Sequence, residues 1–453
     1  MLSSIFEYFL KGAFPRPSDG YAPDENPEKS GTQNQQLTTI YMGEQSMEKS
    51  FLKKTVCLNF PSEGFYQECM EDHKKMRTFM NDTHQRFPEI FPEDFNKNFT
   101  FHDFVISEKQ NGFVMRRIKL QNQEVYQIRP SFMMPYMTAE TAEVEKALYL
   151  RRWGVPFDAL AYVFGRDAMF WQRAYVSLGR NSVVGTTIKS SDLLPEHLSV
   201  DEKHSRFNGE KVFIATTVAQ ECILGCGFAE SAGTSELTEA YRDFKEEARN
   251  VNPEYTPETV NTDGWEPTRN AWKNLFPTVI TILCFLHAFL KIKERCRRSG
   301  KFLKVIGDKV WNAYHSETLT QFSQRIRRLR EWASLLEDSP VKKAVSDLCG
   351  KAAKFKAAFQ KPNAHRTSNM VDRLMNYQNR VLFAMQYFHG STETARLSLR
   401  AMALTWNFHP YGTRAKYNNP NLISPFCGVN KFCYHENWLQ NLLVAGSMGG
   451  WRR

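Results

Sequence analysis

Residues Leu198 to His204 read LSVDEKH, and Lys211 to Val218, which follow a turn at Gly209, read KVFIATTV. A third apolar run, CILGCGFA, covers Cys222 to Ala229. Each run has the length and the β-branched content of a strand. Because the connections between the runs are short, we expect the three strands to pair in an antiparallel meander.

The stretch after this meander alternates between helix and strand. Glu236 to Arg249 has apolar residues at helical spacing. The segment TPETVNTDGW predicts a fourth strand that ends at Asp263, and TVITILCF, Thr278 to Phe285, predicts a fifth. A short helix around Ala271 and Trp272 separates these two strands. This order of elements is that of an RNase H-like fold, so we predict an α/β protein with such a core at residues 186–290 and 365–400.

The chain before the predicted core divides into three parts. Residues 1–50 are rich in Pro, Gly, Ser, Asn, Gln and charge, which is typical of a flexible leader. Residues 51–138 have short alternating stretches, FVMRRIKL and VYQIRPSF, and predict a mixed module with strands. Residues 139–185 predict three short helices joined by turns that contain glycine. These helices resemble a helix-turn-helix DNA reader that uses Arg173 and Arg180, although a plain helical linker fits equally well.

Positive charge is concentrated between the fifth strand and residue 364. The whole chain of 453 residues has a formal net charge of +10. From Leu290 to Lys361 there are 18 Lys and Arg residues against seven Asp and Glu, a net charge of +11. We therefore predict that residues 291–364 are a basic helical insertion that binds the phosphates of DNA, although a solvated helical surface is the plainer interpretation. The candidates for DNA contact are Lys291, Arg295, Arg298, Arg325, Arg328 and Lys354.

Two carboxylates stand where the predicted sheet can bring them together. Asp201 lies on the first strand and Asp263 closes the fourth, and these strands are neighbours in the expected fold. Paired carboxylates are ligands for Mg²⁺ or Mn²⁺. Two such ions about 4 Å apart can activate water or a 3′-hydroxyl on a phosphodiester. Taken singly, Asp201 could instead pair with Lys203 or Arg206, and Asp263 could simply form a turn with the glycine that follows it.

These motifs together carry a family resemblance over roughly residues 195 to 400. The segments are VDEKH followed by GEKVFIATTV, then VNTDGW, ILCFLHA with Cys284 and His287, and HRTSNMVDRL. They resemble DDE-type insertion-sequence transposases of the Mutator-like and hAT-like RNase H-fold group. The resemblance implies a Mg²⁺- or Mn²⁺-dependent enzyme that cleaves and transfers DNA at transposon ends. Its partners would be duplex DNA, both ends and target, and further copies of the same chain.

The third acidic ligand has two candidates. In the family a Glu normally occupies a TN-x-x-ER-like helix, whereas the matching segment here carries Asp372, directly before Arg373. Glu393 follows a predicted helix break at His389-Gly390-Ser391. If the helix continued instead, the two acids would be about 31 Å apart, so both could not reach one metal pair. The resemblance favours Asp372. We expect His287 to contact a DNA phosphate or to order a loop, because two ligands with Cys284 do not make a zinc site.

Two other functions remain open beside this one: a transposase-derived DNA-binding protein that no longer cuts, and an RNase H-fold nuclease acting on RNA or branched DNA. Nine scattered cysteines favour a reducing, intracellular location. With DNA as the partner, we expect a cytoplasmic, nucleoid-associated protein, or a nuclear one in a eukaryote. The most apolar stretch, Leu275 to Leu290, is too short and too interrupted to span a membrane. Residues 401–453 are expected to form a C-terminal tail. Two incomplete cysteine and histidine sets are expected to pack rather than to bind zinc: Cys57, Cys69, His73 and His84, and Cys427, Cys433 and His435.

Overall fold

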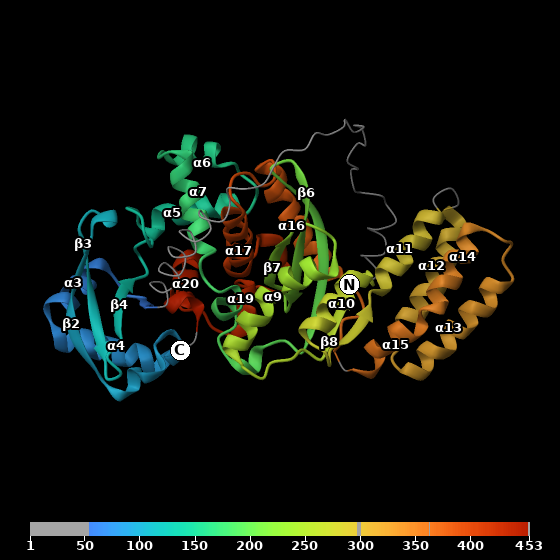
Figure 1. Ribbon diagram of the computed structural model, residues 1–453, viewed down its shortest axis with the longest axis horizontal. Coiled ribbons are helices and arrows are strands. Elements are labelled where there is room, and N and C mark those ends of the chain that lie inside the picture. The colour runs from blue at the N-terminus through green and yellow to red at the C-terminus, as the bar shows by residue number, and fades with distance from the viewer. Residues whose placement is uncertain (1–53, 297–299, 362, 452–453) are drawn as a thin grey trace, which may run out of the picture. The chain divides into compact units, whose positions relative to one another are not determined.

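The computed structural model describes residues 54–296, 300–361 and 363–451. The predicted leader, residues 1–50, and Arg298 therefore lie outside the described residues. The described chain is a mixed α/β structure with two mixed sheets (Figure 1). The predicted α/β class is confirmed.

The larger sheet has five strands in the order β7-β6-β5-β8-β9. β5 (His197–Phe207), β6 (Glu210–Ala219) and β7 (Cys222–Ala229) form the antiparallel meander. β8 (Thr259–Thr262) and β9 (Ile280–Leu283) continue the sheet on the other side of β5 and run parallel to it. The five strands lie where the apolar runs predict them, with differences of a few residues at their ends.

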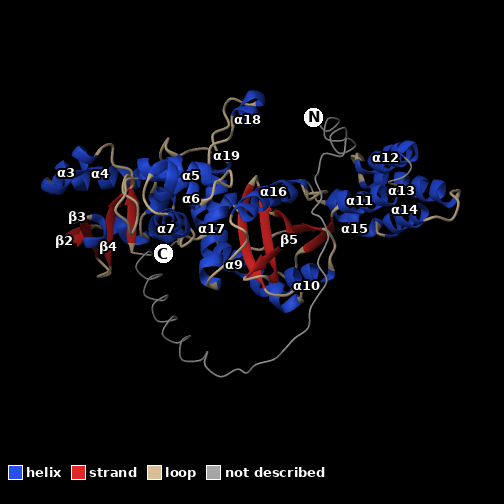
Figure 2. Cartoon of the chain, turned by 90° about the horizontal axis from the view of Figure 1, so that it is seen from above, coloured by secondary structure: helices blue, strands red, loops and turns tan. Residues whose placement is uncertain are grey.

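Helices cover both faces of this sheet (Figure 2). α9 (Thr234–Val251) and α10 (Glu266–Leu275) pack on one face, and α16 (Asn369–Ala384) and α17 (Thr392–Phe408) pack on the other. Successive residues of a strand point to opposite faces, so β6 contributes Phe213 and Ala215 to the first layer and the intervening residues to the second. For the same reason, neighbouring residues of β5 face different helices.

Five helices between β9 and α16 form the insertion. They enclose a hydrophobic core of their own, to which Ile306, Phe322 and Leu329 contribute. Apolar residues at helical spacing line this core, and the basic residues lie largely outside it. The helices are α11 (Phe285–Arg295), α12 (Gly300–Tyr314), α13 (Leu319–Ser334), α14 (Pro340–Gly350) and α15 (Ala352–Gln360).

The smaller sheet lies near the start of the described chain. Its order is β1-β4-β3-β2, with β1 parallel to β4 and the other pairs antiparallel. β3 and β4 are the strands that the alternating stretches predict. The strands and the helices around them are β1 (Thr55–Leu58), α3 (Glu63–Glu71), α4 (His73–Arg86), β2 (Phe99–Ser107), β3 (Phe113–Leu120) and β4 (Val125–Pro130).

Three helices then lead to the larger sheet, as the sequence predicts: α5 (Thr141–Arg151), α6 (Phe157–Phe164) and α7 (Ala168–Leu178). The short helix α8 (Val183–Thr187) follows them. Short 3-10 turns cover Pro88–Ile90, Glu93–Lys97, Glu108–Gln110, Ser191–Leu193 and Ser447–Gly450.

The segment expected to be a C-terminal tail is folded. α17 continues past residue 400 to Phe408, and α18 (Thr413–Asn418), α19 (Pro425–Asn430) and α20 (Trp438–Ala445) follow. α20 is buried in one continuous hydrophobic core, to which the smaller sheet, α5 to α7, and α16 and α17 also contribute. The backbone N–H of Cys57 on β1 donates to Ser447 Oγ at 3.1 Å. The first described strand is therefore held by the last described residues.

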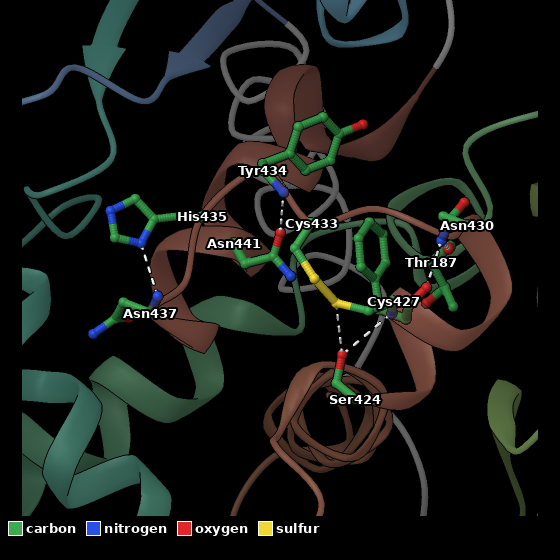
Figure 3. The surroundings of a disulfide bond; sticks show 10 residues. Thr187, Ser424, Cys427, Asn430, Cys433, Tyr434, His435, Asn437 and Asn441 are labelled. Atoms are coloured by element: carbon green, nitrogen blue, oxygen red, sulfur yellow. Dashed lines mark hydrogen bonds between the residues drawn. A yellow bond between two sulfur atoms is a disulfide. The ribbon is translucent and has the colours of Figure 1, made fainter. Parts of the chain in front are cut away.

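Cys427 and Cys433 form a disulfide, with their Cα atoms 5.6 Å apart (Figure 3). This corrects the expectation that both residues only pack. The two cysteines are six positions apart in the sequence, and the turn after α19 brings them together. Beside the bond, the Tyr434 N–H donates to Asn441 Oδ1, and His435 accepts from the Asn437 N–H through Nδ1 (Figure 3). The histidine is thus engaged with the backbone and not with the two sulfur atoms.

The first cysteine and histidine set does not appear among the groups of described residues whose ligand atoms lie within 4.8 Å of one another. Cys57 and Cys69 are buried free thiols. His73 lies against the guanidinium of Arg116, and the ring of His84 packs on those of Phe91 and Phe95. Among the described residues, no helix is both long enough and apolar enough to cross a membrane.

Candidate active site

Asp201 and Asp263 lie at the same level on two neighbouring strands. Ser199 of β5 pairs with Asn261 of β8, and each aspartate follows two residues further along its parallel strand. Asp201 is still within β5, and Asp263 comes directly after β8. The negative charge of Asp263 acts on Asp201. The structure therefore brings the two predicted acids together at the centre of the sheet.

Asp372 and His287 complete the group from two helices. Asp372 is in the first turn of α16, and His287 is in the first turn of α11. A carboxylate oxygen of Asp201, one of Asp372 and a ring nitrogen of His287 lie within 4.8 Å of one another. Asp263 is not a member of this group of three, but its negative charge raises the pKa of Asp201.

Glu393, the alternative third acid, is not part of the group of Asp201, Asp372 and His287. It lies in the first turn of α17, after the helix break that the sequence indicates between α16 and α17. Ser391 caps α17 by accepting from the Thr394 N–H. Of the two candidates, the structure therefore places Asp372 beside Asp201.

Burial and mutual repulsion set the charge state of the group. Burial raises the pKa of Asp201 to about 7, helped by the negative charge of Asp263 and opposed by His287. Burial also raises the pKa of Asp372. The pKa of His287 is raised to about 9, first by its hydrogen bond with Cys284 and then by the charges of Asp372 and Asp201. A histidine with a raised pKa thus lies beside two carboxyl groups whose pKa is raised as well.

Ser368 ties these side chains together. Its hydroxyl lies 3.2 Å from Nδ1 of His287 and 3.3 Å from a carboxylate oxygen of Asp372, to which it donates. The Ser368 N–H donates to the Cys284 sulfur at 3.2 Å. Ser368 immediately precedes α16, and Cys284 immediately precedes α11. The starts of the two helices are therefore held against each other at the carboxylates.

The local contacts of Asp263 are those of a turn former. Its Oδ1 accepts from the Trp265 N–H at 2.7 Å, which is a local turn of the aspartate with its own backbone. Gly264 has φ +92°, and a Cβ there would lie 2.1 Å from Leu283 Cδ1 on β9. A positive φ together with this close approach favours glycine, so the turn that holds Asp263 directly after β8 depends on Gly264.

The alternative role of Asp201 as an ion-pair partner is not seen. The ammonium of Lys203 donates to the amide oxygen of Asn379 on α16. Within the described ranges, no ion pair joins Asp201 to Lys203 or Arg206. Asp201 is instead surrounded by the other acids and by His287.

Glu202 is a half-buried acid that the sequence analysis missed. It points to the α9 and α10 face, where its Oε1 accepts from Tyr241 Oη and Thr268 Oγ1, both at 2.7 Å. Burial raises its pKa to about 7. The available signal was strand periodicity: an acid directly after Asp201 on a strand covered by helices on both faces must itself be covered.

The group contains the donors that a hard divalent cation prefers. Asp201, Asp263 and Asp372 offer carboxylate oxygens. Three acids meet beside one histidine in a half-buried place, and a bound cation would stabilise the charged form of the carboxyl groups. The residues present therefore fit Mg²⁺ or Mn²⁺. A second group, Glu196, His197 and Glu258, meets the same geometric criterion, but both its acids are exposed.

The basic candidates for DNA contact are dispersed over several helices. Lys291 and Arg295 are exposed on α11 and line a groove of about 640 Å³, together with Lys343 and Lys351 from the α14 side. Arg325 is already engaged, because it donates to the Asn312 carbonyl at 2.7 Å. The remaining candidates are exposed on other helices, Arg328 on α13 and Lys354 on α15.

The two arginines of the predicted helix-turn-helix differ in exposure. Arg173 is exposed on α7, whereas Arg180 is half-buried, with its guanidinium 5.2 Å from the centre of the Tyr136 ring. Arg173 can reach a partner freely, but Arg180 already has a contact within the chain.

Comparison with models of known protein families and with curated proteins found no match to this sequence.

Proposed function

We propose that this chain is a DNA transposase with an RNase H-like catalytic core, which cleaves and joins DNA at transposon ends with the help of divalent cations. The observation that carries the proposal is the meeting of Asp201, Asp263 and Asp372 at the centre of the five-stranded sheet. Three acids from two neighbouring strands and one helix are the donor set that phosphodiester chemistry with metal ions requires.

The order of the elements supports the same proposal. Three antiparallel strands followed by two strands parallel to the first, with the first strand in the middle, is the arrangement of an RNase H-like sheet. A helical insertion after the fifth strand, followed by a helix with the last acid, agrees with the resemblance to DDE-type transposases. The sheet order alone supports a fold, and the acids supply the reason to assign chemistry to it.

Each residue of the group has a proposed role. Asp201, Asp263 and Asp372 would hold Mg²⁺ or Mn²⁺, which when bound activates water or a 3′-hydroxyl and stabilises the leaving oxygen of a phosphodiester. Ser368 orients Asp372 and His287 by its two contacts. The imidazolium of His287 lies close enough to contribute positive charge toward a phosphate.

We also propose duplex DNA as the partner. The insertion carries the positive excess of the chain, and Lys291 and Arg295 follow His287 on the same helix by about one and two turns. α5 to α7, with Arg173 exposed, would add a second DNA contact as a helix-turn-helix. Two transposon ends must be handled together, so we expect a homo-oligomer on DNA.

The deciding experiment uses the full-length protein and a duplex that contains the DNA flanking its gene. With Mg²⁺ we expect cleavage at the element ends, and we expect Asp201→Asn and Asp372→Asn to reduce the cleavage rate by at least about a thousandfold while DNA binding persists. Glu393→Gln is the matched control and should cut at the wild-type rate.

Other outcomes would identify the alternatives. Binding to the ends without cleavage would favour a transposase-derived DNA-binding protein. Cleavage of RNA or branched DNA, but not of element ends, would favour a nuclease. Cleavage by Asp201→Asn at the wild-type rate would contradict the assignment of the active site.

A further inference from the structure

A cavity of about 300 Å³ lies between the smaller sheet, α7 and α20. None of the acids of the candidate active site lines it. Its volume is at the lower end of the range that small-molecule sites occupy. Six residues set its chemistry: Arg129, Gln110, Gln127, Asn181, Leu178 and Leu443.

Arg129 brings a buried positive charge to this cavity. It lies on β4 and is only 8% exposed. Its Nη1 donates to the Met133 carbonyl at 2.8 Å. In the described part of the chain no ion pair involves Arg129, and no Asp or Glu lines the cavity. A buried guanidinium without an acidic partner is costly, and an anion that enters beside it offsets this cost.

Three side-chain amides add acceptors around the arginine. Gln110 donates through Nε2 to the Met134 carbonyl at 2.6 Å, and Gln127 Nε2 donates to a methionine sulfur at 2.8 Å. Asn181 Nδ2 donates to the Leu178 carbonyl at 3.0 Å. The protein thus engages the NH₂ group of each amide, so the amide oxygens are the atoms suited to accept from a ligand N–H. Leu178 and Leu443 form an apolar wall.

We propose that this cavity binds a small organic molecule that carries an acid group together with N–H donors. The acid group would pair with the guanidinium of Arg129, which can donate two hydrogen bonds to a carboxylate or a phosphate. The N–H donors would reach the amide oxygens of Gln110, Gln127 and Asn181, and the apolar body would lie against Leu178 and Leu443. Free α-amino acids and nucleoside monophosphates share this chemistry. The cavity is separate from the proposed active site, so the inference does not depend on the proposed function.

Calorimetry on the full-length protein distinguishes the sources. The probes are the individual L-α-amino acids, the nucleoside 5′-monophosphates, acetate and inorganic phosphate. We expect a member of one of the first two classes to bind, and acetate and phosphate to bind more weakly or not at all. Binding by none of the organic probes, or binding of acetate or phosphate as tight as that of the best organic probe, would overturn the proposal.

Variants locate the binding in this cavity. Arg129→Gln should weaken the Kd of the best probe by at least about tenfold, because a charge-assisted hydrogen bond is removed. Arg117→Gln is the matched control, since Arg117 is in the same small sheet but pairs with Asp103 and does not line the cavity. An unchanged Kd in Arg129→Gln would contradict the proposal.

A measurement on the wild-type protein covers the case in which Arg129→Gln does not fold. We expect the best probe to slow amide hydrogen exchange in residues 105–115, 127–136 and 177–181, which surround the cavity. Protection confined to other segments would overturn the assignment.

Discussion

The Ser368 hydroxyl lies 3.2 Å from Nδ1 of His287, and this contact joins the residue before α16 to the first turn of α11. α11 is the first helix of the insertion and α16 is the helix that follows it, so the insertion leaves the sheet and returns to it at the acids. A movement of the helical insertion would therefore first change the positions of His287 and Asp372.

Ser368→Ala should slow DNA cleavage by about tenfold without weakening DNA binding, because Asp372 and His287 are no longer oriented by a shared hydroxyl. The Mg²⁺ concentration for half-maximal cleavage should rise, which a general loss of stability would not cause. Ser391→Ala is the control, since it removes a helix cap on α17 and should lower stability by about 1 kcal/mol at unchanged metal dependence.

Asp263→Asn and Asp263→Ala should separate the two roles of this residue. Asparagine can still accept from the Trp265 N–H, so Asp263→Asn should keep its unfolding free energy but lose cleavage. Asp263→Ala should lose cleavage and also about 1 kcal/mol of stability, measured by urea unfolding. If Asp263→Asn cleaves element ends at the wild-type rate, Asp263 serves the turn alone.

The double change Lys291→Gln and Arg295→Gln should weaken binding to all DNA sequences alike. The slope of log K against log salt should flatten by about 0.9 for each DNA phosphate that the protein no longer neutralises. Arg327→Gln is the matched control, because Arg327 on α13 is exposed but pairs with Glu331. An unchanged slope in the double variant would mean that the groove is only a solvated surface.

Cys433→Ser should lower the free energy of unfolding by about 2 kcal/mol under oxidising conditions, because the disulfide closes a short loop in the unfolded chain. Addition of a reductant should lower the wild-type stability by a similar amount and leave Cys433→Ser unchanged. Equal stability of the two proteins before reduction would contradict a formed disulfide.

Local patterns were sufficient to predict the elements of the larger sheet. β5 and β6 are β-branched runs of strand length, and the break at His389-Gly390-Ser391 marks the gap between α16 and α17. The position of Asp201 next to Asp263 follows from the order of the strands, because β5 and β8 must be neighbours in the expected fold.

Long-range contacts were beyond the reach of these patterns. The place of His287 between Asp201 and Asp372 depends on how two helix starts meet across a long insertion, and spacing along the chain contains no information on that. The disulfide was missed because an odd number of scattered cysteines favoured free thiols, although the short spacing between Cys427 and Cys433 made a bond possible. The burial of Arg129 could not be predicted, because it comes from tertiary packing and no sequence motif marks this residue.

The hydrogen bond between Cys57 and Ser447 has a consequence for synthesis on the ribosome. β1 is among the first described segments to emerge, whereas Ser447 is added 390 residues after Cys57. The core shared by the smaller sheet and α20 can therefore close only when nearly all of the described chain has been made. Until then, the apolar strands that are made early stay exposed to solvent. For such a protein, residues made late in translation determine when the early ones finish folding.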